Sequence, residues 1–108
     1  MEGRKSQGFP VRWLVSFLIS PIACKDGRIS GSGMASNLAV GGCTVVSDTR
    51  VYPGVQMELR LYLPEDVMPL DVDRAVVRWT KGRKFRLEFI SMQSEAQERL
   101  HRLVDTRD

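Results

Sequence analysis

The feature that most constrains the fold is an alternation of apolar and polar residues in the middle of the chain. Apolar side chains occupy every second position from Val55 to Leu63, with polar residues or tyrosine between them. Because successive side chains of a strand point to opposite sides, this pattern predicts an antiparallel strand with one buried face. Pro53-Gly54 before it and Pro64-Glu65-Asp66 after it are turn residues that end strand pairing.

A second strand begins at Leu70, and its alternation changes phase at Asp73-Arg74, which indicates a β-bulge. After the change of phase, three side chains are expected to share the core face: Ala75, Val77 and Trp79. The Lys81-Gly82-Arg83 turn then leads into an alternating strand over residues 85–89, which is expected to form a hairpin with the preceding strand.

The region before these strands is also expected to be extended. Basic residues followed by the apolar segment Trp13–Cys24 vaguely resemble a secretion leader, but Pro10 and Pro21 flank a strand-like alternation. The segment is also shorter than the roughly 20 residues that span a bilayer. We therefore interpret it as a strand and predict another at Cys43–Ser47. Residues 27–40 are expected to be irregular because of two glycines.

The only helical signal lies at the end of the chain. Ser94 and Gln97 match a capping box, and one helical face carries the apolar side chains of Ala96, Leu100, Leu103 and Val104. The sequence thus predicts an all-β fold, a six-stranded antiparallel barrel with a C-terminal amphipathic helix. We expect one domain over residues 1–108, with a flexible segment at 1–9, the barrel at about 10–92 and the helix at about 94–106.

Residues for catalysis or metal binding are scarce. The only histidine, His101, falls in the predicted helix, where a surface position is expected. Cys24 and Cys43 lack metal-ligand spacing, and two cysteines of this kind are typical of buried, reduced thiols in a cytoplasmic protein. We therefore expect a binding domain that is not an enzyme and that holds no metal or cofactor.

Positive charge is concentrated in the predicted hairpin. The net charge is +3, and six basic residues fall between Asp73 and Glu88 with no acidic residue among them: Arg74, Arg78, Lys81, Arg83, Lys84 and Arg86. This balance suits an anionic ligand but is too small to imply nucleic acid. Nucleic acid is an unlikely partner for a second reason, since the aromatic residues Trp79 and Phe85 are expected in the core.

Several segments together resemble a PilZ domain: residues 4–12, Asn37–Gly42, Pro53-Gly54, 76–79, 85–89 and the Ser94 helix. The resemblance covers nearly the whole chain, from about Arg4 to Val104. It implies a six-stranded antiparallel barrel with a terminal helix, and many members are bacterial receptors for cyclic di-GMP. Binding in the family uses an R-x-x-x-R motif before the first strand and a [D/N]-x-S-x-x-G motif in a barrel turn.

This sequence matches both motifs in part. Arg4 corresponds to the first arginine, whereas Gly8 stands where the second is expected; Asn37 and Gly42 match the second motif, whereas Ala39 replaces its serine. Losing a forked arginine contact costs about 2–3 kcal/mol and losing a neutral hydroxyl contact about 1 kcal/mol. A basic residue of the hairpin could compensate, so the resemblance implies five candidate ligand-binding residues: Arg4, Asn37, Ala39, Gly42 and Arg78.

Two functions therefore stay open. The first is a cyclic di-GMP-binding signalling domain. The second is a degenerate barrel that has lost the nucleotide and acts as a protein-interaction adaptor, for example in motility or surface-attachment signalling. Neither function requires insertion into a membrane.

Overall fold

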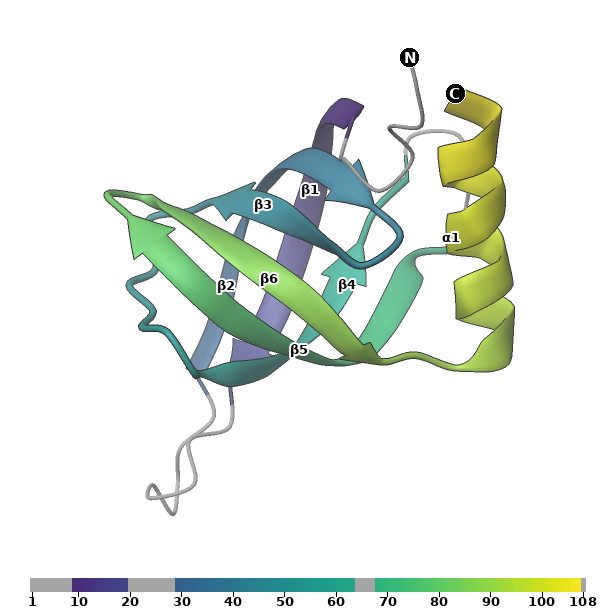
Figure 1. Cartoon of the computed structure of the whole chain (residues 1–108). Helices are drawn as coiled ribbons and strands as arrows, with labels where there is room; N and C mark the ends of the chain where they lie inside the picture. Colours follow the sequence, from purple (N-terminus) through teal and green to yellow (C-terminus); the bar gives the residue numbers. More distant parts are fainter. Residues whose placement is uncertain (1–8, 20–28, 64–67, 108) are drawn as a thin grey trace.

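The structure is a computed structural model, and it describes residues 9–19, 29–63 and 68–107. The strands and the helix follow one another as β1 (Phe9–Ile19), β2 (Ile29–Ala39), β3 (Gly42–Val46), β4 (Gln56–Leu61), β5 (Leu70–Lys81), β6 (Lys84–Ser91) and α1 (Ser94–Arg107). All pairings are antiparallel, and the strands close into a barrel in the order β1-β2-β3-β6-β5-β4 (Figure 1). The predicted fold class, a six-stranded antiparallel barrel followed by one helix, is confirmed.

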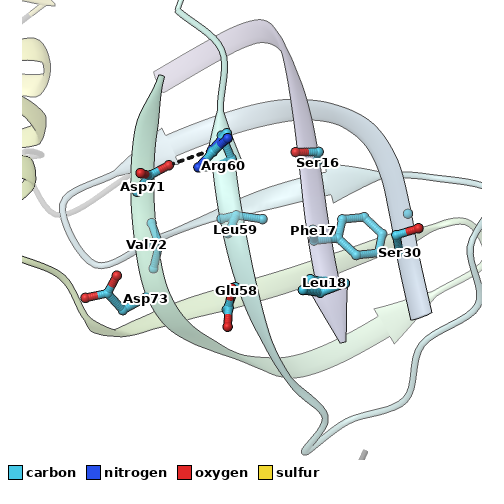
Figure 2. A pocket seen from close by; sticks show the side chains of 11 residues that line it. Ser16, Phe17, Leu18, Ser30, Glu58, Leu59, Arg60, Asp71, Val72 and Asp73 are labelled. Carbon is cyan, nitrogen blue, oxygen red and sulfur yellow. Dashed lines mark hydrogen bonds and ion pairs between the residues drawn. The ribbon is translucent and has the colours of Figure 1, made fainter. Parts of the chain in front are cut away.

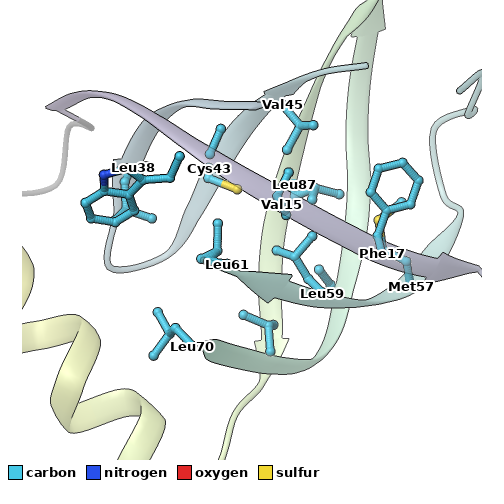
Figure 3. Packing of buried hydrophobic residues seen from close by; sticks show 14 of the residues in the cluster. Val15, Phe17, Leu38, Cys43, Val45, Met57, Leu59, Leu61, Leu70 and Leu87 are labelled. Carbon is cyan, nitrogen blue, oxygen red and sulfur yellow. The ribbon is translucent and has the colours of Figure 1, made fainter. Parts of the chain in front are cut away.

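The barrel interior is filled by the apolar residues of the alternating strands. Val15, Leu61 and Leu87 are fully buried and point into the interior (Figure 3). The rings of Phe17 and Phe85 meet edge to face, with centroids 5.8 Å apart. Such pairs contribute about 0.5–1.5 kcal/mol beyond the burial of their apolar area.

The structure tests the predicted buried thiol for one of the two cysteines. Cys43 is a free thiol inside the barrel, as predicted. Burial raises the pKa of its thiol to about 12, although the nearby charge of Arg86 acts in the opposite direction. Cys43 is therefore an inert core residue at neutral pH. Cys24 lies outside the described residues.

Strand β5 contains two bulges. The first is the predicted one: Met57 pairs with Ala75 and Leu59 with Val72, so Asp73 and Arg74 share one position of the ladder. The second was not predicted: Val77 pairs with Leu87 and Trp79 with Arg86, which leaves Arg78 as the extra residue. The extra residue reverses the side on which the following side chain lies. Trp79 is consequently 43% exposed, and its predicted place in the core is wrong.

The hairpin of β5 and β6 extends beyond β4, whereas β3 stays paired with β6 as far as Lys84. Pairing between β4 and β5 ends at Gln56 and Val76, and the backbone of Val77 still bonds to residues 54 and 55. By contrast, β5 and β6 remain paired out to Lys81 and Lys84. Gly82 turns the chain there with a φ of +62°, a conformation that glycine adopts without strain, so the predicted hairpin turn is confirmed.

Strand β2 is more regular than the sequence suggested. Residues 29–39 form one continuous strand, so the expected extended course is confirmed, and the irregularity is confined to a bulge at Ser36. A Cβ atom at Gly31 would overlap the ring of Phe17, and one at Gly33 would overlap the carbonyl oxygen of Val46. These glycines thus allow close packing inside a continuous strand. The strand predicted for the Trp13 segment is confirmed up to Ile19, and residues 20–24 lie outside the described part.

Helix α1 packs its apolar face against the barrel, as predicted. Leu100 and Val104 are buried. The guanidinium of Arg99 donates hydrogen bonds to the carbonyl oxygens of Met68, at 2.7 Å, and Pro69, at 3.0 Å. The helix begins at Ser94, as predicted, but its N-cap differs. The backbone amide of Gln97 donates to the carbonyl of Gln93, which makes Gln93 the N-cap residue in place of Ser94. No helix among the described residues is long and apolar enough to cross a membrane.

Candidate ligand-binding site

The register of four neighbouring strands places a set of polar and aromatic residues side by side on the outside of the barrel. Asn37 on β2 pairs with Thr44 on β3, Thr44 pairs with Arg86 on β6, and Arg86 pairs with Trp79 on β5. Neighbouring strands lie about 4.8 Å apart, so this row spans roughly 15 Å. We call these four residues the Asn37 row.

Asn37 supplies an unsatisfied acceptor at one end of the row. It lies in β2 itself, because the turn of this hairpin consists of Val40 and Gly41. Its Oδ1 atom is buried and has no hydrogen-bond partner among the described residues. Leaving a buried acceptor unpaired costs about 1–3 kcal/mol. A ligand that brings an N–H group to this atom would recover that energy.

The middle of the row combines a hydroxyl with a cation. Thr44 is 8% exposed, and Nη1 of Arg86 lies 3.5 Å from its Oγ1 atom, at the limit of a hydrogen bond. Within the described residues no carboxylate forms an ion pair with Arg86. The guanidinium of Arg86 is therefore available to an anion at the cost of one weak contact.

Arg78 is already engaged by another residue of the barrel. Its Nε atom forms an ion pair with Oε1 of Glu88 on β6, and both side chains are about half exposed, at 54% and 46%. Arg78 is the extra residue of the second bulge and lies next to Trp79 in the chain. It is thus beside the Asn37 row, with its charge neutralised by a neighbour.

The remaining predicted site residues divide into two groups. Ala39 and Gly42 face each other at the ends of β2 and β3, two positions along the strands from the Asn37 row. Ala39 is 2% exposed, and a Cβ atom at Gly42 would overlap the carbonyl oxygen of Leu87. Both residues therefore have packing roles. Arg4 and Gly8 lie outside the described residues.

The start of β1 lies next to the row. The backbone of Pro10 pairs with Asn37. Arg4 precedes Pro10 by six residues in the sequence, and an extended chain spans at most about 3.6 Å per residue, so the chain length allows at most about 22 Å between the backbones of Arg4 and Pro10.

Sequence reasoning missed Thr44, Trp79 and Arg86 as members of a site. Arg86 had a detectable signal, since it alternates with the buried Phe85 and Leu87 and so must face outward. Trp79 had none, because its exposure depends on the bulge at Arg78.

A concavity lies on another part of the barrel wall, across β1, β2, β4 and β5 (Figure 2). It has a volume of about 700 Å³, and its charged lining consists of Glu58, Arg60, Asp71 and Asp73. Arg60 is paired with Asp71 at 2.8 Å. The excess of carboxylates disfavours an anionic ligand there. No group of three metal-ligating side chains occurs within the described part of the chain.

Comparisons with known proteins agree with this architecture. The profile of the PilZ domain matches residues 12–106. The crystal structure of the PilZ domain of CeSA from a cellulose-synthesizing bacterium superposes with a TM-score of 0.66 at 17% identity, covering 93% of this chain and 96% of that one. The Bacillus subtilis inhibitor of motility (MotI/DgrA) superposes with a TM-score of 0.70 at 22% identity, covering 99% of this chain and 52% of that one.

This chain thus corresponds to about half of the Bacillus subtilis protein. No curated protein sequence matches it. The two structural similarities, at low identity, establish the fold, and the profile match covers most of the chain. The chain therefore belongs to the PilZ domain family.

Proposed function

We propose that this PilZ domain is a signalling receptor that binds cyclic di-GMP on the Asn37 row. The observation that carries the proposal is the side-by-side placement of an unsatisfied acceptor, a hydroxyl, a cation and an exposed indole. Each of these groups has a counterpart in a guanine nucleotide.

The roles follow from the chemistry of the ligand. Oδ1 of Asn37 accepts a hydrogen bond from an N–H group of guanine, and the indole of Trp79 stacks on a base face. Arg86 neutralises a phosphate with charge-assisted hydrogen bonds. The hydroxyl of Thr44 replaces the one that Ala39 lacks, and Arg4 supplies the second cation from the segment before β1. Binding, and no chemical conversion, is the activity that we assign to this domain.

The first test is calorimetric titration of the protein with cyclic di-GMP. We expect Arg86→Ala to weaken binding about 10- to 100-fold, because a charge-assisted hydrogen bond contributes about 1.5–3 kcal/mol. We expect Trp79→Ala to weaken it about 5- to 100-fold, because stacking on one base contributes about 1–3 kcal/mol.

Arg74→Ala is the matched control for this titration. Arg74 is an exposed arginine on the same strand, at the first bulge and away from the Asn37 row. Its loss removes the same charge, and we expect a change of less than about twofold because exposed charges at a distance are screened. Equal losses in Arg74→Ala and Arg86→Ala would mean that only net charge matters and would contradict the proposed site.

A second prediction concerns Glu88. Its carboxylate holds the guanidinium of Arg78 and therefore competes with a phosphate for that cation. Glu88→Gln removes the negative charge while keeping the shape, so we expect about three- to tenfold tighter binding of cyclic di-GMP. Titrations of the double variant Arg78→Ala/Glu88→Gln provide the check, since the gain should vanish when Arg78 is absent.

One set of observations favours the alternative, a PilZ barrel that acts as a protein-interaction adaptor. Ala39 is buried, Gly8 carries no side chain, and Arg78 is engaged by Glu88, so three cyclic di-GMP contacts are missing or occupied. This alternative predicts no heat of binding in the titration of either wild type or Glu88→Gln. It also predicts a purified complex with a protein partner whose affinity does not change when cyclic di-GMP is added.

A further inference from the structure

The row next to the Asn37 row has a different composition. Met34 on β2 pairs with Val46 on β3, Val46 pairs with Lys84 on β6, and Lys84 pairs with Lys81 on β5. Met34 is 41% and Val46 38% exposed, although both are large apolar residues. An apolar half and a cationic half are thus joined in one row across four strands.

The two rows together form an amphipathic surface. Trp79 and Arg86 of the Asn37 row lie two ladder positions from Lys81 and Lys84. We call six residues the hairpin patch: Met34, Val46, Trp79, Lys81, Lys84 and Arg86. Neither row contains an acidic residue, and the long aliphatic stems of lysine and arginine can cover apolar surface while their charges reach outward.

The position of the patch leaves it accessible. Part of it lies on the β5–β6 hairpin, which projects from the barrel on the side away from α1 (Figure 1). The patch combines three cations with three apolar side chains. A ligand that uses all of it must therefore be anionic and must also offer an apolar layer about as deep as one side chain. Phosphate groups alone gain nothing from Met34 and Val46, whereas the interfacial layer of a bilayer accommodates cations, indole rings and aliphatic side chains together.

We propose that the hairpin patch docks this domain on an anionic lipid surface. The domain lies on the surface without crossing it. The cations of Lys81, Lys84 and Arg86 face the lipid headgroups, and Met34, Val46 and Trp79 contact the acyl boundary. Trp79 and Arg86 belong to both surfaces, but the inference does not depend on the proposed function, because the other four residues of the patch lie outside the Asn37 row.

The test is co-sedimentation with vesicles of phosphatidylcholine, with and without about 30% phosphatidylglycerol. We expect binding only to the anionic vesicles, and a weaker association as salt rises. Tryptophan fluorescence gives a second readout: Trp13 is 6% exposed, so a blue shift on binding should come from Trp79 and should disappear in Trp79→Phe.

Three variants separate the contributions. We expect Lys84→Glu to lower vesicle affinity at least about fivefold, while Arg74→Glu, the same change at an exposed position off the patch, has little effect. Met34→Ser/Val46→Thr should lower affinity by a similar factor although it changes no charge. Thermal melts show whether each variant is folded.

Several outcomes would overturn the proposal. Equal binding to neutral vesicles, or equal losses for Arg74→Glu and Lys84→Glu, would exclude a specific patch. Full vesicle binding by Met34→Ser/Val46→Thr would reduce the interaction to charge alone. Tight, salt-resistant binding of a single-stranded oligonucleotide that blocks vesicle binding would assign the patch to nucleic acid. A silent cyclic di-GMP titration beside clear vesicle binding would reject the proposed function and leave this proposal intact.

Discussion

Replacing Gly42 with alanine is expected to lower the free energy of unfolding by at least about 2–3 kcal/mol, a drop in Tm of roughly 10–20 °C. The added methyl group would overlap the backbone carbonyl oxygen of Leu87, where β3 pairs with β6. A backbone atom held in a ladder cannot move aside as a flexible side chain does, so the two strands must separate locally. Thermal and urea unfolding followed by circular dichroism measure the effect.

Gly41→Ala is the matched control, one residue earlier. A Cβ atom at Gly41 meets nothing within 4 Å, and its φ angle is not in the left-handed region. We expect a change within about 0.5 kcal/mol. The comparison also tests the role of the motif glycine: a stable Gly42→Ala protein that has lost cyclic di-GMP binding would contradict our assignment of Gly42 to packing.

Phe85→Ala is expected to destabilise the barrel by about 3–5 kcal/mol. Phe85 is 2% exposed and packs edge to face on Phe17, so truncation leaves a cavity in the core and removes the ring contact. This loss is a large part of the roughly 5–15 kcal/mol that stabilises a domain of this kind. Urea unfolding should show an earlier midpoint with a similar slope.

Trp79→Ala is the control for Phe85→Ala, because it removes an exposed aromatic side chain instead of a buried one. Both aromatic residues belong to one hairpin, but Trp79 is 43% exposed and its loss should cost about 1 kcal/mol or less. If Trp79→Ala proved as destabilising as Phe85→Ala, the bulge at Arg78 would not place the indole outside.

The alternating patterns predicted the fold well, because burial on one face of a strand leaves a period of two in the sequence. The strand with Met57, Leu59 and Leu61 buried and the helix with Leu100 and Val104 buried both follow their patterns. The first bulge was predictable for the same reason, since the phase of the buried residues changes at Asp73 and Arg74.

The candidate site was less predictable, because it depends on cross-strand register. Asn37 and Trp79 are 42 residues apart in the sequence and belong to one row only through three successive pairings. The bulge at Arg78 leaves no clear trace, because the buried Val76 and Val77 obscure the change of phase. Gly31 and Gly33 misled the prediction for β2, because composition does not distinguish a glycine that loosens a strand from one that fits under a ring.

The projecting part of the β5–β6 hairpin affects how readily the protein can aggregate. Beyond Val77, β5 has no backbone partner on its β4 side among the described residues, so this stretch is a sheet edge in a fold that otherwise closes on itself. Exposed edges can recruit strands from other molecules and nucleate fibrils. Here the edge is only a few residues long, carries Arg78 and Lys81, and is distorted by a bulge. The same residues that give the hairpin its charge thus protect the protein from aggregation through that edge.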